Sequence, residues 1–409
     1  MGISPKQKKI LAFSYTKKYQ ALICDGAVRS GKTSLMTVAF VDWAMREFDN
    51  TNFAICGKTV GSAIKNIIVP YMALGYAQQK YSIHFTRADN KMIVRQGTRE
   101  NVFYVYGGKD ESSYMLIQGI TLAGVLLDEV ALMTRSFVEQ SLARCLSFKN
   151  RRYWFNCNPE NPSHWFYTEW IQKPEEHRAL HLHFLMSDNP MLDDETLREA
   201  ERTWSGVFYQ RYVLGLWTLA EGLIYPHFSQ AVVPTKERDY TQYQAACDYG
   251  IHNPTCFGLF GLSGGVWYMV KEYYHSGRDT KQPKTDDEYY RDLEAFVGDV
   301  PVRRVIIDPS ASSFITLINR KNRFTTVRAD NAVIDGIRNT ATALNNGVVK
   351  INDCCSHTQA EFKVYAWDEK AVEDKPIKES DHCMDLLRYF IQTNRLAVPA
   401  KKNRLSDYI

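Results

Sequence analysis

The residues best equipped for chemistry in the first half are Gly26–Thr33, which read GAVRSGKT. They match the pattern G-x-x-x-x-G-K-[ST] of a phosphate-binding loop. In such a loop the glycines let backbone N–H groups face phosphate oxygens, the lysine reaches the β- and γ-phosphates, and the final hydroxyl serves Mg²⁺. The candidate nucleotide-binding residues of the loop are therefore Gly26, Arg29, Ser30, Gly31, Lys32 and Thr33. Arg29 could steady phosphate charge or equally point into solvent.

A phosphate loop also needs a carboxylate for its metal ion, and the run GVLLDE at residues 124–129 supplies two. Asp128 at the end of this apolar run would hold Mg²⁺ through water, and Glu129 would activate the attacking water. The acidic pair, together with the lack of a base-reading Asn-Lys-x-Asp motif, favours ATP over GTP. Within the later turn NCNPENP, Asn158 could sense the γ-phosphate, and a plain turn is the alternative.

Three aspartates of the second half follow or interrupt apolar segments. Asp248 ends the run YQAACD, Asp308 ends RRVIID, and Asp385 lies in a stretch with helical periodicity, three positions after His382. Two-metal phosphodiester cleavage requires hard oxygen ligands on converging elements. We therefore predict a site for two Mg²⁺ or Mn²⁺ ions at these aspartates, with His382 as a ligand or proton shuttle. Asp381 is a weaker candidate, and each aspartate alone could simply mark the end of a strand.

The elements that position these residues can be predicted from the apolar patterns. A strand at residues 21–24 leads into the phosphate loop, and helical spacing follows it, which is the context that makes the motif credible. Around Gly215 the helical pattern gives way to a turn-rich stretch, and later residues predict strands, a hairpin and helices. We predict an α/β chain with a nucleotide-binding domain at 1–215, a linker at 216–240 and a second domain at 241–409.

Composition limits the class of protein. The chain has 409 residues, 45% hydrophobic and 23% charged, with no apolar run long enough to cross a membrane and no apolar signal segment. We expect a cytoplasmic protein without a membrane partner, and reduced thiols at its cysteines. The net charge of +4 is too small to indicate nucleic acid by itself. Basic runs at 149–152, 320–323 and 401–404 are more often solvated surface than DNA contacts.

Taken in order, the motifs resemble those of the terminase large subunits of headful-packaging tailed phages, over nearly the whole chain. GAVRSGKT, VLLDE and NCNPENP resemble that family's Walker A motif, Walker B motif with catalytic glutamate, and coupling motif. ACDYG, VIIDPS and DHCMDLLRY resemble its nuclease. The resemblance implies an ASCE-type P-loop ATPase domain and a ribonuclease-H-like nuclease domain. It places metal-binding acids at Asp248, Asp308 and Asp385, with His382 matching a histidine of one branch.

The resemblance also implies function and partners. It suggests ATP-driven translocation of viral double-stranded DNA into the procapsid and endonucleolytic cleavage of concatemeric DNA. It suggests a terminase small subunit, the portal protein and a ring of subunits as partners, in the host cytoplasm and transiently at the portal. Gln7 resembles the family's adenine-contacting glutamine, with a solvated helix surface as the alternative. The family's trans-acting arginine is left open among four residues, Arg87, Arg99, Arg135 and Arg144.

Two other functions compete with this one. A helicase-like or repair ATPase could carry its own nuclease, although it would normally show further helicase motifs in a second ATPase-like lobe. A non-enzymatic capsid or portal-associated protein could contain a fortuitous phosphate loop.

Overall fold

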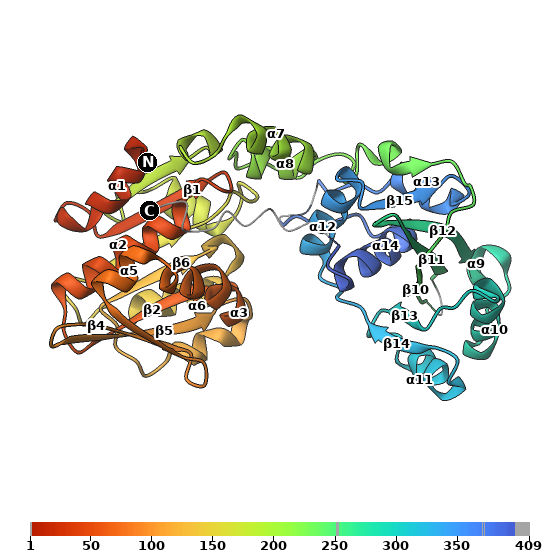
Figure 1. Ribbon diagram of the computed structural model, residues 1–409, viewed down its shortest axis with the longest axis horizontal. Helices are drawn as coiled ribbons and strands as arrows, with labels where there is room; N and C mark the ends of the chain where they lie inside the picture. Colours follow the sequence, from red (N-terminus) through yellow and green to blue (C-terminus); the bar gives the residue numbers. More distant parts are fainter. Residues whose placement is uncertain (1, 251–252, 370, 372, 397–409) are drawn as a thin grey trace. The chain divides into compact units, whose positions relative to one another are not determined.

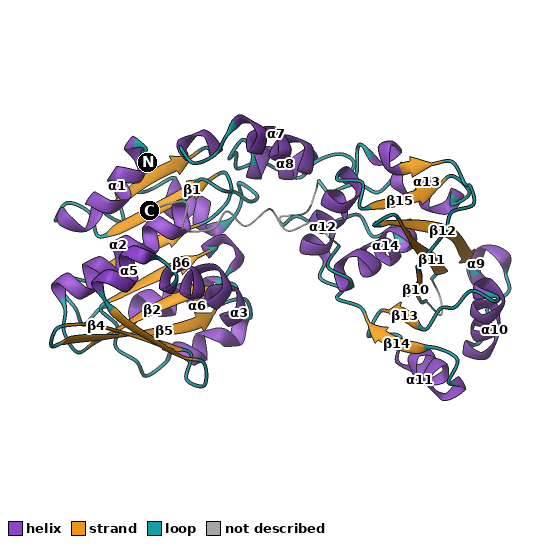
Figure 2. Ribbon diagram, viewed as in Figure 1, coloured by secondary structure: helices purple, strands orange, loops and turns teal. Residues whose placement is uncertain are grey.

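The computed structural model describes residues 2–250, 253–369, 371 and 373–396. These residues form two compact units, each built around its own sheet (Figures 1 and 2). The first unit contains the described residues up to Arg198 together with Tyr209–Leu219. The second contains Glu199–Phe208 and the described residues from Ala220 onward. The passage from Leu219 to Ala220 lies inside the span 216–240 that the sequence predicts as a linker.

An eight-stranded sheet organises the first unit, in the order β3-β4-β5-β2-β6-β7-β1-β8. Neighbouring strands from β5 to β8 in this order pair in parallel, while β3, β4 and β5 pair antiparallel. The central strands are fully buried apolar runs, as parallel strands covered on both faces should be. The strands are β1 (Ala21–Gly26), β2 (Thr51–Gly57), β3 (Ser82–Thr86), β4 (Lys91–Gln96), β5 (Arg99–Gly107), β6 (Gly124–Asp128), β7 (Arg152–Asn156) and β8 (Ala179–Phe184).

Helices cover both faces of this sheet. Alternate residues of β1 face two separate cores: Leu22 packs in a cluster with residues of α1 and α2, and Ile23 in a cluster with residues of α6. The first cluster is aromatic, with Phe40, Trp43 and Trp154 in mutual ring contact. The helices of this unit are α1 (Pro5–Ala12), α2 (Lys32–Glu47), α3 (Val60–Ala63), α4 (Val69–Met72), α5 (Gly75–Lys80) and α6 (Arg135–Ala143). Two more helices, α7 (Asp194–Thr203) and α8 (Gly206–Tyr212), each contain residues of both units.

A seven-stranded mixed sheet organises the second unit, in the order β14-β13-β10-β11-β12-β15-β9. Strands β10, β11 and β12 form an antiparallel meander, and β13 joins β10 in parallel. The predicted hairpin is confirmed, with Gly264 and Gly265 both at positive φ in its turn. The strands are β9 (Val232–Val233), β10 (Gln242–Asp248), β11 (Thr255–Ser263), β12 (Val266–His275), β13 (Arg304–Ile307), β14 (Thr325–Arg328) and β15 (Val349–Asn352).

The helices of the second unit are α9 (Gly277–Thr280), α10 (Asp286–Val297), α11 (Ser312–Lys321), α12 (Val333–Asn345), α13 (Ser356–Phe362) and α14 (His382–Thr393). Residues of α10 and α11 pack with one face of the sheet in a cluster that includes Leu293 and Phe314. Helix α14 lies against β10, β11 and β13. The predicted α/β class with a P-loop sheet and a separate second domain is therefore confirmed. Within the described residues, no helix has both the length and the apolar character needed to span a bilayer.

Candidate functional sites

The phosphate loop connects β1 to α2 and is shaped by two glycines. Gly26 has φ of +117°, and a Cβ there would lie 2.0 Å from the carbonyl oxygen of Phe184 on β8. Gly31 has φ of +80° and caps the N-terminus of α2. Only glycine adopts both conformations without strain, and at Gly26 only glycine leaves room for the neighbouring backbone. The loop is thereby held in a fixed shape at the positive end of α2.

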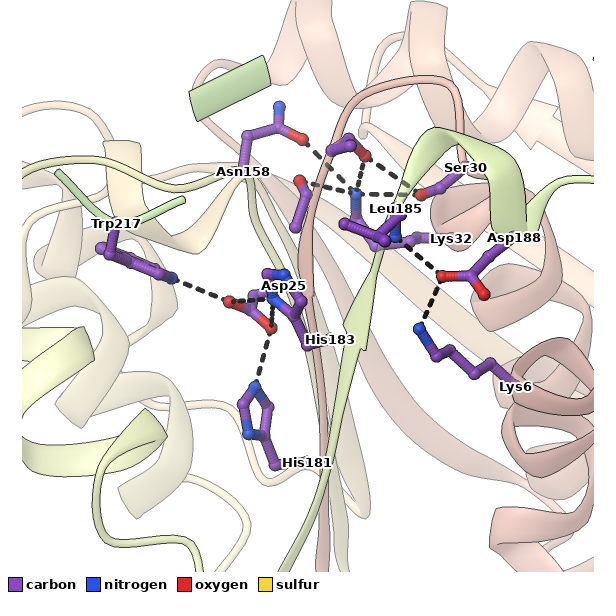
Figure 3. Close-up of polar contacts among 12 residues, drawn as sticks. Lys6, Asp25, Ser30, Lys32, Asn158, His181, His183, Leu185, Asp188 and Trp217 are labelled. Atoms are coloured by element: carbon purple, nitrogen blue, oxygen red, sulfur yellow. Dashed lines mark hydrogen bonds and ion pairs between the residues drawn. The ribbon is translucent and has the colours of Figure 1, made fainter. Parts of the chain in front are cut away.

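Lys32 is folded back onto its own loop. Its Nζ donates to the carbonyls of Gly26 and Ala27 at 3.1 and 2.6 Å, and to Ser30 Oγ at 3.2 Å (Figure 3). Nζ also lies 3.4 Å from Asn158 Oδ1, so the structure brings the predicted phosphate lysine and the predicted sensor amide together. Burial lowers the pKa of Lys32, and nearby negative charges, including those of Asp25 and Asp128, oppose that effect.

The predicted magnesium pair is also in contact. Thr33 Oγ1 donates to Asp128 Oδ1 at 3.1 Å, and Asn156 Nδ2 donates to Thr33 Oγ1 at 2.8 Å and to Asp128. Burial raises the pKa of Asp128, although the hydrogen bonds from Asn156 and Thr33 act against it. Asn156 Oδ1 is buried and has no hydrogen-bond partner among the described residues. A carboxylate, a hydroxyl and an orphaned amide oxygen are suitable neighbours for a hydrated Mg²⁺ ion.

The sequence did not predict a role for Asn156, because the role of γ-phosphate sensor was assigned to Asn158 in the same turn. Its position at the end of β7 could have indicated a role, because β7 is adjacent to β6 and Asn156 is the register partner of Asp128.

Glu129 and Arg29 both have left-handed backbone conformations, with φ of +61° and +57°. Such a conformation costs a non-glycine residue on the order of 1 kcal/mol and is concentrated at functional sites. Glu129 directly follows Asp128 at the end of β6. The carbonyl of Arg29 accepts a hydrogen bond of 2.7 Å from Asn189 Nδ2, which fixes the backbone of the loop at that point.

Gln7 lies against the phosphate loop and is buried. Its Nε2 donates to the carbonyl of Ser30 at 3.3 Å, and its Oε1 accepts from the backbone N–H of Ser4 in a capping box at the start of α1. The alternative of a solvated helix surface is therefore wrong. The side chain approaches the loop because α1 packs against α2.

Asp25, which immediately precedes the loop, is the main residue that the sequence reasoning missed. Its carboxylate lies 2.7 Å from His181 Nε2 and 3.2 Å from His183 Nδ1, both on β8, and accepts from Trp217 Nε1 at 2.8 Å (Figure 3). Burial alone would raise the pKa of Asp25, but the contacts with His181 and His183 hold it well below its usual range. In the sequence, the one indication of a special role was that Asp25 is a charged residue directly after an apolar predicted strand.

Of the four arginines left open by the sequence, Arg99 has a structural role. Its Nη1 donates to the carbonyls of Met45 and Arg46 at 2.6 and 2.8 Å, at the end of α2. Arg135 is exposed and paired with Glu139 and Glu169. Arg87 lies in the stretch that follows β3. The buried Nε of Arg144 has no hydrogen-bond partner among the described residues.

In the second unit, Asp248 and His382 form a direct pair. His382 Nδ1 lies 2.9 Å from Asp248 Oδ2, and both side chains are largely buried. Burial raises the pKa of Asp248, the hydrogen bond from His382 lowers it, and the charge of Asp385 raises it further. Burial would lower the pKa of His382, but the bond to Asp248 outweighs burial and raises it. His382 therefore carries positive charge most readily while Asp248 is ionised.

Asp308 and Asp385 are held by other partners. Asp308 accepts from the backbone N–H of Ser310 at 2.7 Å and from Asn331 Nδ2 at 3.1 Å. Burial acts to raise the pKa of Asp308, and these hydrogen bonds outweigh it and lower the pKa. Asp385 lies in the first turn of α14, 2.8 Å from Arg388 Nη2 and 3.6 Å from Lys378 Nζ. Lys378 is also 3.4 Å from Asp381.

The three predicted acids share one neighbourhood without forming a metal cage. Burial raises the pKa of Tyr389, and the charges of Asp248, Asp385 and Asp308 raise it further, so all three act on this one side chain. Within the described residues, however, no three His, Cys, Asp or Glu side chains are arranged to hold a metal ion. The hard carboxylate donors fit divalent cations, but in this structure His382, Arg388 and Lys378 supply the neighbouring positive charge.

Glu361 is a further buried acid of this region that the sequence did not indicate. Its Oε2 accepts from the backbone N–H groups of Cys383 and Met384 at 2.7 and 3.2 Å and so caps α14. Burial raises the pKa of Glu361 to about 7, although these two bonds favour its ionised form. The cap fixes the start of the helix that carries His382 and Asp385.

Comparisons with known proteins show which proteins the chain resembles. Residues 23–230 match a family model described as the N-terminal part of the T4likevirus-type terminase large subunit. The terminase large subunit of Escherichia phage T5 is 22% identical over 228 residues, which are 51% of this chain and 50% of that protein. The chain thus matches about half the length of this curated relative.

Solved structures resemble the chain over a greater length. The large terminase from a thermophilic bacteriophage is 48% identical, with a TM-score of 0.91 over 96% of this chain and 99% of that one. The large terminase of the same thermophilic phage in complex with ATP-γ-S is 46% identical, with a TM-score of 0.87 over 95% of this chain and 98% of that one.

Proposed function

The chain belongs to the large terminase family of phages and serves in DNA packaging, and from this premise we propose how its two sites work. The phosphate loop binds ATP with Mg²⁺ and hydrolyses it to drive viral double-stranded DNA into the procapsid. Structures of the thermophilic phage's large terminase with ADP and with ATP-γ-S support this assignment of the nucleotide. The observation that carries it is the contact of Thr33, Asp128 and Asn156 beside the buried Lys32.

Each side chain of the ATP site then has a role. Lys32 leaves its carbonyl partners for the β- and γ-phosphates, while Ser30 and the loop glycines present backbone N–H groups to the phosphates. Thr33 and Asp128 hold Mg²⁺, and Glu129 takes a proton from the attacking water. Asn158 responds to the γ-phosphate because it already contacts Lys32. Gln7 contacts the adenine, and Arg29 steadies phosphate charge.

For the second unit we propose cleavage of concatemeric DNA with two divalent ions, Mg²⁺ or Mn²⁺. Asp248, Asp308 and Asp385 would hold them, and when bound they would supply Lewis acidity to the phosphodiester. Asp248 also orients His382, which can hold a proton near the cleaved bond because its pKa is raised. Arg388 orients Asp385 through the ion pair of 2.8 Å.

The family assignment also suggests an assembly. We propose that the chain acts in the host cytoplasm as a ring of subunits on the portal protein of the procapsid, with a terminase small subunit that selects the DNA. These partners are consistent with DNA packaging, and the proposal assigns none of the residues described above to contacts with them.

Cutting of supercoiled plasmid by the purified chain tests the nuclease proposal. We expect cutting that requires Mn²⁺ or Mg²⁺, that a chelator stops, and that Asp308→Ala removes. The variant should still hydrolyse ATP at nearly the rate of the original protein, because Asp308 lies in the other unit. Cutting that survives chelation or the substitution would contradict two-metal cleavage at these aspartates.

A further inference from the structure

The three basic runs of the sequence have different surroundings. Residues 149–152 line a cavity in the first unit. In the run 320–323, Lys321 lies 3.4 Å from Asp287 and Arg323 lies 3.6 Å from Glu294, so acids of the second unit partly neutralise it. The run 401–404 lies outside the described residues. The cavity is a feature that neither ATP hydrolysis nor DNA cutting uses.

This cavity has a volume of about 390 Å³ and lies at the sheet edge opposite the phosphate loop. Gln20 and Arg178, which precede β1 and β8, and Arg152, which begins β7, all line it. The phosphate loop follows the other end of β1, and six residues of strand span about 20 Å. The cavity is therefore separate from the ATP site.

Its lining is strongly cationic. Six basic side chains contribute, and the one carboxylate among the described lining residues is Glu47, which pairs with Arg46 at 2.9 Å. Burial lowers the pKa of Arg152, and the charge of Arg46 lowers it further, so like charges repel within the lining. An anion would relieve this repulsion. The basic residues are Lys17, Arg46, Lys149, Arg151, Arg152 and Arg178.

The arginines are held in place by backbone carbonyls. Arg46 Nη2 donates to the carbonyl and hydroxyl of Ser14, each at 3.1 Å, and Arg152 Nη2 donates to the carbonyl of Thr16 at 2.6 Å. Arg178 Nη2 donates to the carbonyl of Lys17 at 3.0 Å. The cations are therefore fixed before a ligand arrives, which reduces the entropy lost on binding.

We propose that this cationic cavity binds backbone phosphates of the packaged DNA. Fixed guanidinium groups flanked by exposed lysines suit phosphate oxygens, and a cavity of this size accommodates one or two phosphate groups rather than a duplex. Such contacts attach DNA without reading its sequence, as a packaging motor requires. The inference rests on the DNA-packaging function. Free phosphate or nucleotide shares the same chemistry, and the experiment below separates these sources.

The test is the salt dependence of binding between the full chain and a short labelled duplex, followed by fluorescence anisotropy. The variant Lys17→Gln/Lys149→Gln removes two exposed cations of the lining. We expect affinity at low salt to fall on the order of tenfold, and the slope of log K against log salt to shrink by about two. DNA-free ATP hydrolysis and thermal stability should stay unchanged, because both lysine side chains are exposed.

The matched control is Arg320→Gln/Lys321→Gln, which removes the same charge from the other described basic run. We expect its slope to change by less than half as much as that of the cavity variant. Equal losses in the two double variants would assign the effect to net charge and overturn the proposal, and so would an unchanged slope in the cavity variant.

Competition separates the two sources of phosphate. Millimolar inorganic phosphate at constant ionic strength should displace little DNA from the original chain, because several contacts act together on a duplex. Loss of phosphate binding in the cavity variant with unchanged DNA binding would overturn the proposal in favour of a free-anion site. A chain that binds no duplex even at low salt would instead overturn the packaging premise itself.

Discussion

Asp128 in the first unit and the three aspartates in the second are buried carboxylates whose surroundings differ. Asp128 contacts a hydroxyl and an amide, Thr33 and Asn156, which are neutral groups already arranged as the site requires. Two aspartates of the second unit sit beside charged partners, with Asp248 against His382 and Asp385 against Arg388, whereas Asp308 accepts from neutral donors. Asp128 thus contacts neutral hydrogen-bond donors, whereas Asp248 and Asp385 are balanced by the protein's own cations.

The difference follows from how many like charges each site contains. One buried carboxylate can be stabilised by hydrogen bonds and a nearby lysine, as Asp128 is by Asn156, Thr33 and Lys32. The charge of Asp385 acts against the ionised form of Asp248, and His382 and Arg388 offset this repulsion in the folded chain. Divalent ions bound at these carboxylates would supply positive charge that His382 and Arg388 supply now, and we therefore expect the stability of this site to respond to divalent ions.

The largest expected effect comes from Glu129→Gln. Losing the carboxylate should slow ATP turnover roughly 10²- to 10⁴-fold, because proton removal from water contributes about that factor. Binding of ATP-γ-S should change little, and plasmid cutting should be unaffected. Steady-state hydrolysis and nucleotide titration on one preparation measure both quantities. A variant that hydrolyses ATP at the original rate would remove Glu129 from the mechanism.

Replacing Arg388 with methionine should break the charge balance of the acid site. The change leaves Asp385 buried beside the other acids without its partner, and such losses typically cost about 3–5 kcal/mol of unfolding free energy. Mn²⁺ should restore part of this stability because it binds the folded state. Urea unfolding with and without Mn²⁺ measures the effect.

Arg338→Met is the matched control for this substitution. Arg338 also pairs with an aspartate three positions away, Asp335, but on a more exposed surface, so its loss should cost about 1 kcal/mol or less. Equal destabilisation in the two variants would show that Arg388 does not balance the acid site in particular.

Asp25→Asn tests whether the ATP site depends on the side-chain contacts of Asp25, which lies outside the recognised motifs. The amide cannot accept from all three of the Asp25 donors, so the base of the phosphate loop should loosen and ATP turnover should fall roughly tenfold. Asp42→Asn is a suitable control, because Asp42 also contacts three side chains, Tyr76, Lys80 and Tyr81, yet lies far along α2. Comparable loss of turnover in both variants would point to general destabilisation.

The smallest effect concerns the pH dependence set by Glu361. Its pKa of about 7 in the folded chain exceeds the ordinary value of 4.5, so its contribution to stability is present below pH 4.5 and is lost as pH rises through 7. Between pH 6 and pH 8 this loss should amount to about 1 kcal/mol. Glu361→Gln should flatten that dependence in urea unfolding curves. An unchanged pH dependence would mean that Glu361 does not titrate in this range.

Much of the ATP site could be predicted from the sequence because its motifs follow strands. Lys32 and Asn158 follow β1 and β7, and Asp128 ends β6. These three strands lie side by side in the sheet, so the side chains meet at one edge. The role of Asn156 and the donors around Asp25 depend on strand order and on β8, which no local pattern specifies. The left-handed backbone of Glu129 was equally invisible in the sequence.

In the second unit the sequence located the acids but not what balances them. Asp248, Asp308 and Asp385 were recognisable from strand ends and helical spacing, whereas Glu361 reaches the start of α14 from α13. The direct pairing of His382 with Asp248 is a long-range contact of the fold. Hydrogen bonds between distant segments have no periodic signature, so only the structure reveals them.

The claim of two separate sites in one chain is tested most directly by measuring ATP turnover and plasmid cutting on the same preparations of three proteins. These are the original chain, Glu129→Gln and Asp385→Ala. We predict that Glu129→Gln loses ATP turnover and keeps Mn²⁺-dependent cutting, and that Asp385→Ala does the reverse. Loss of both activities in either folded variant would contradict the account.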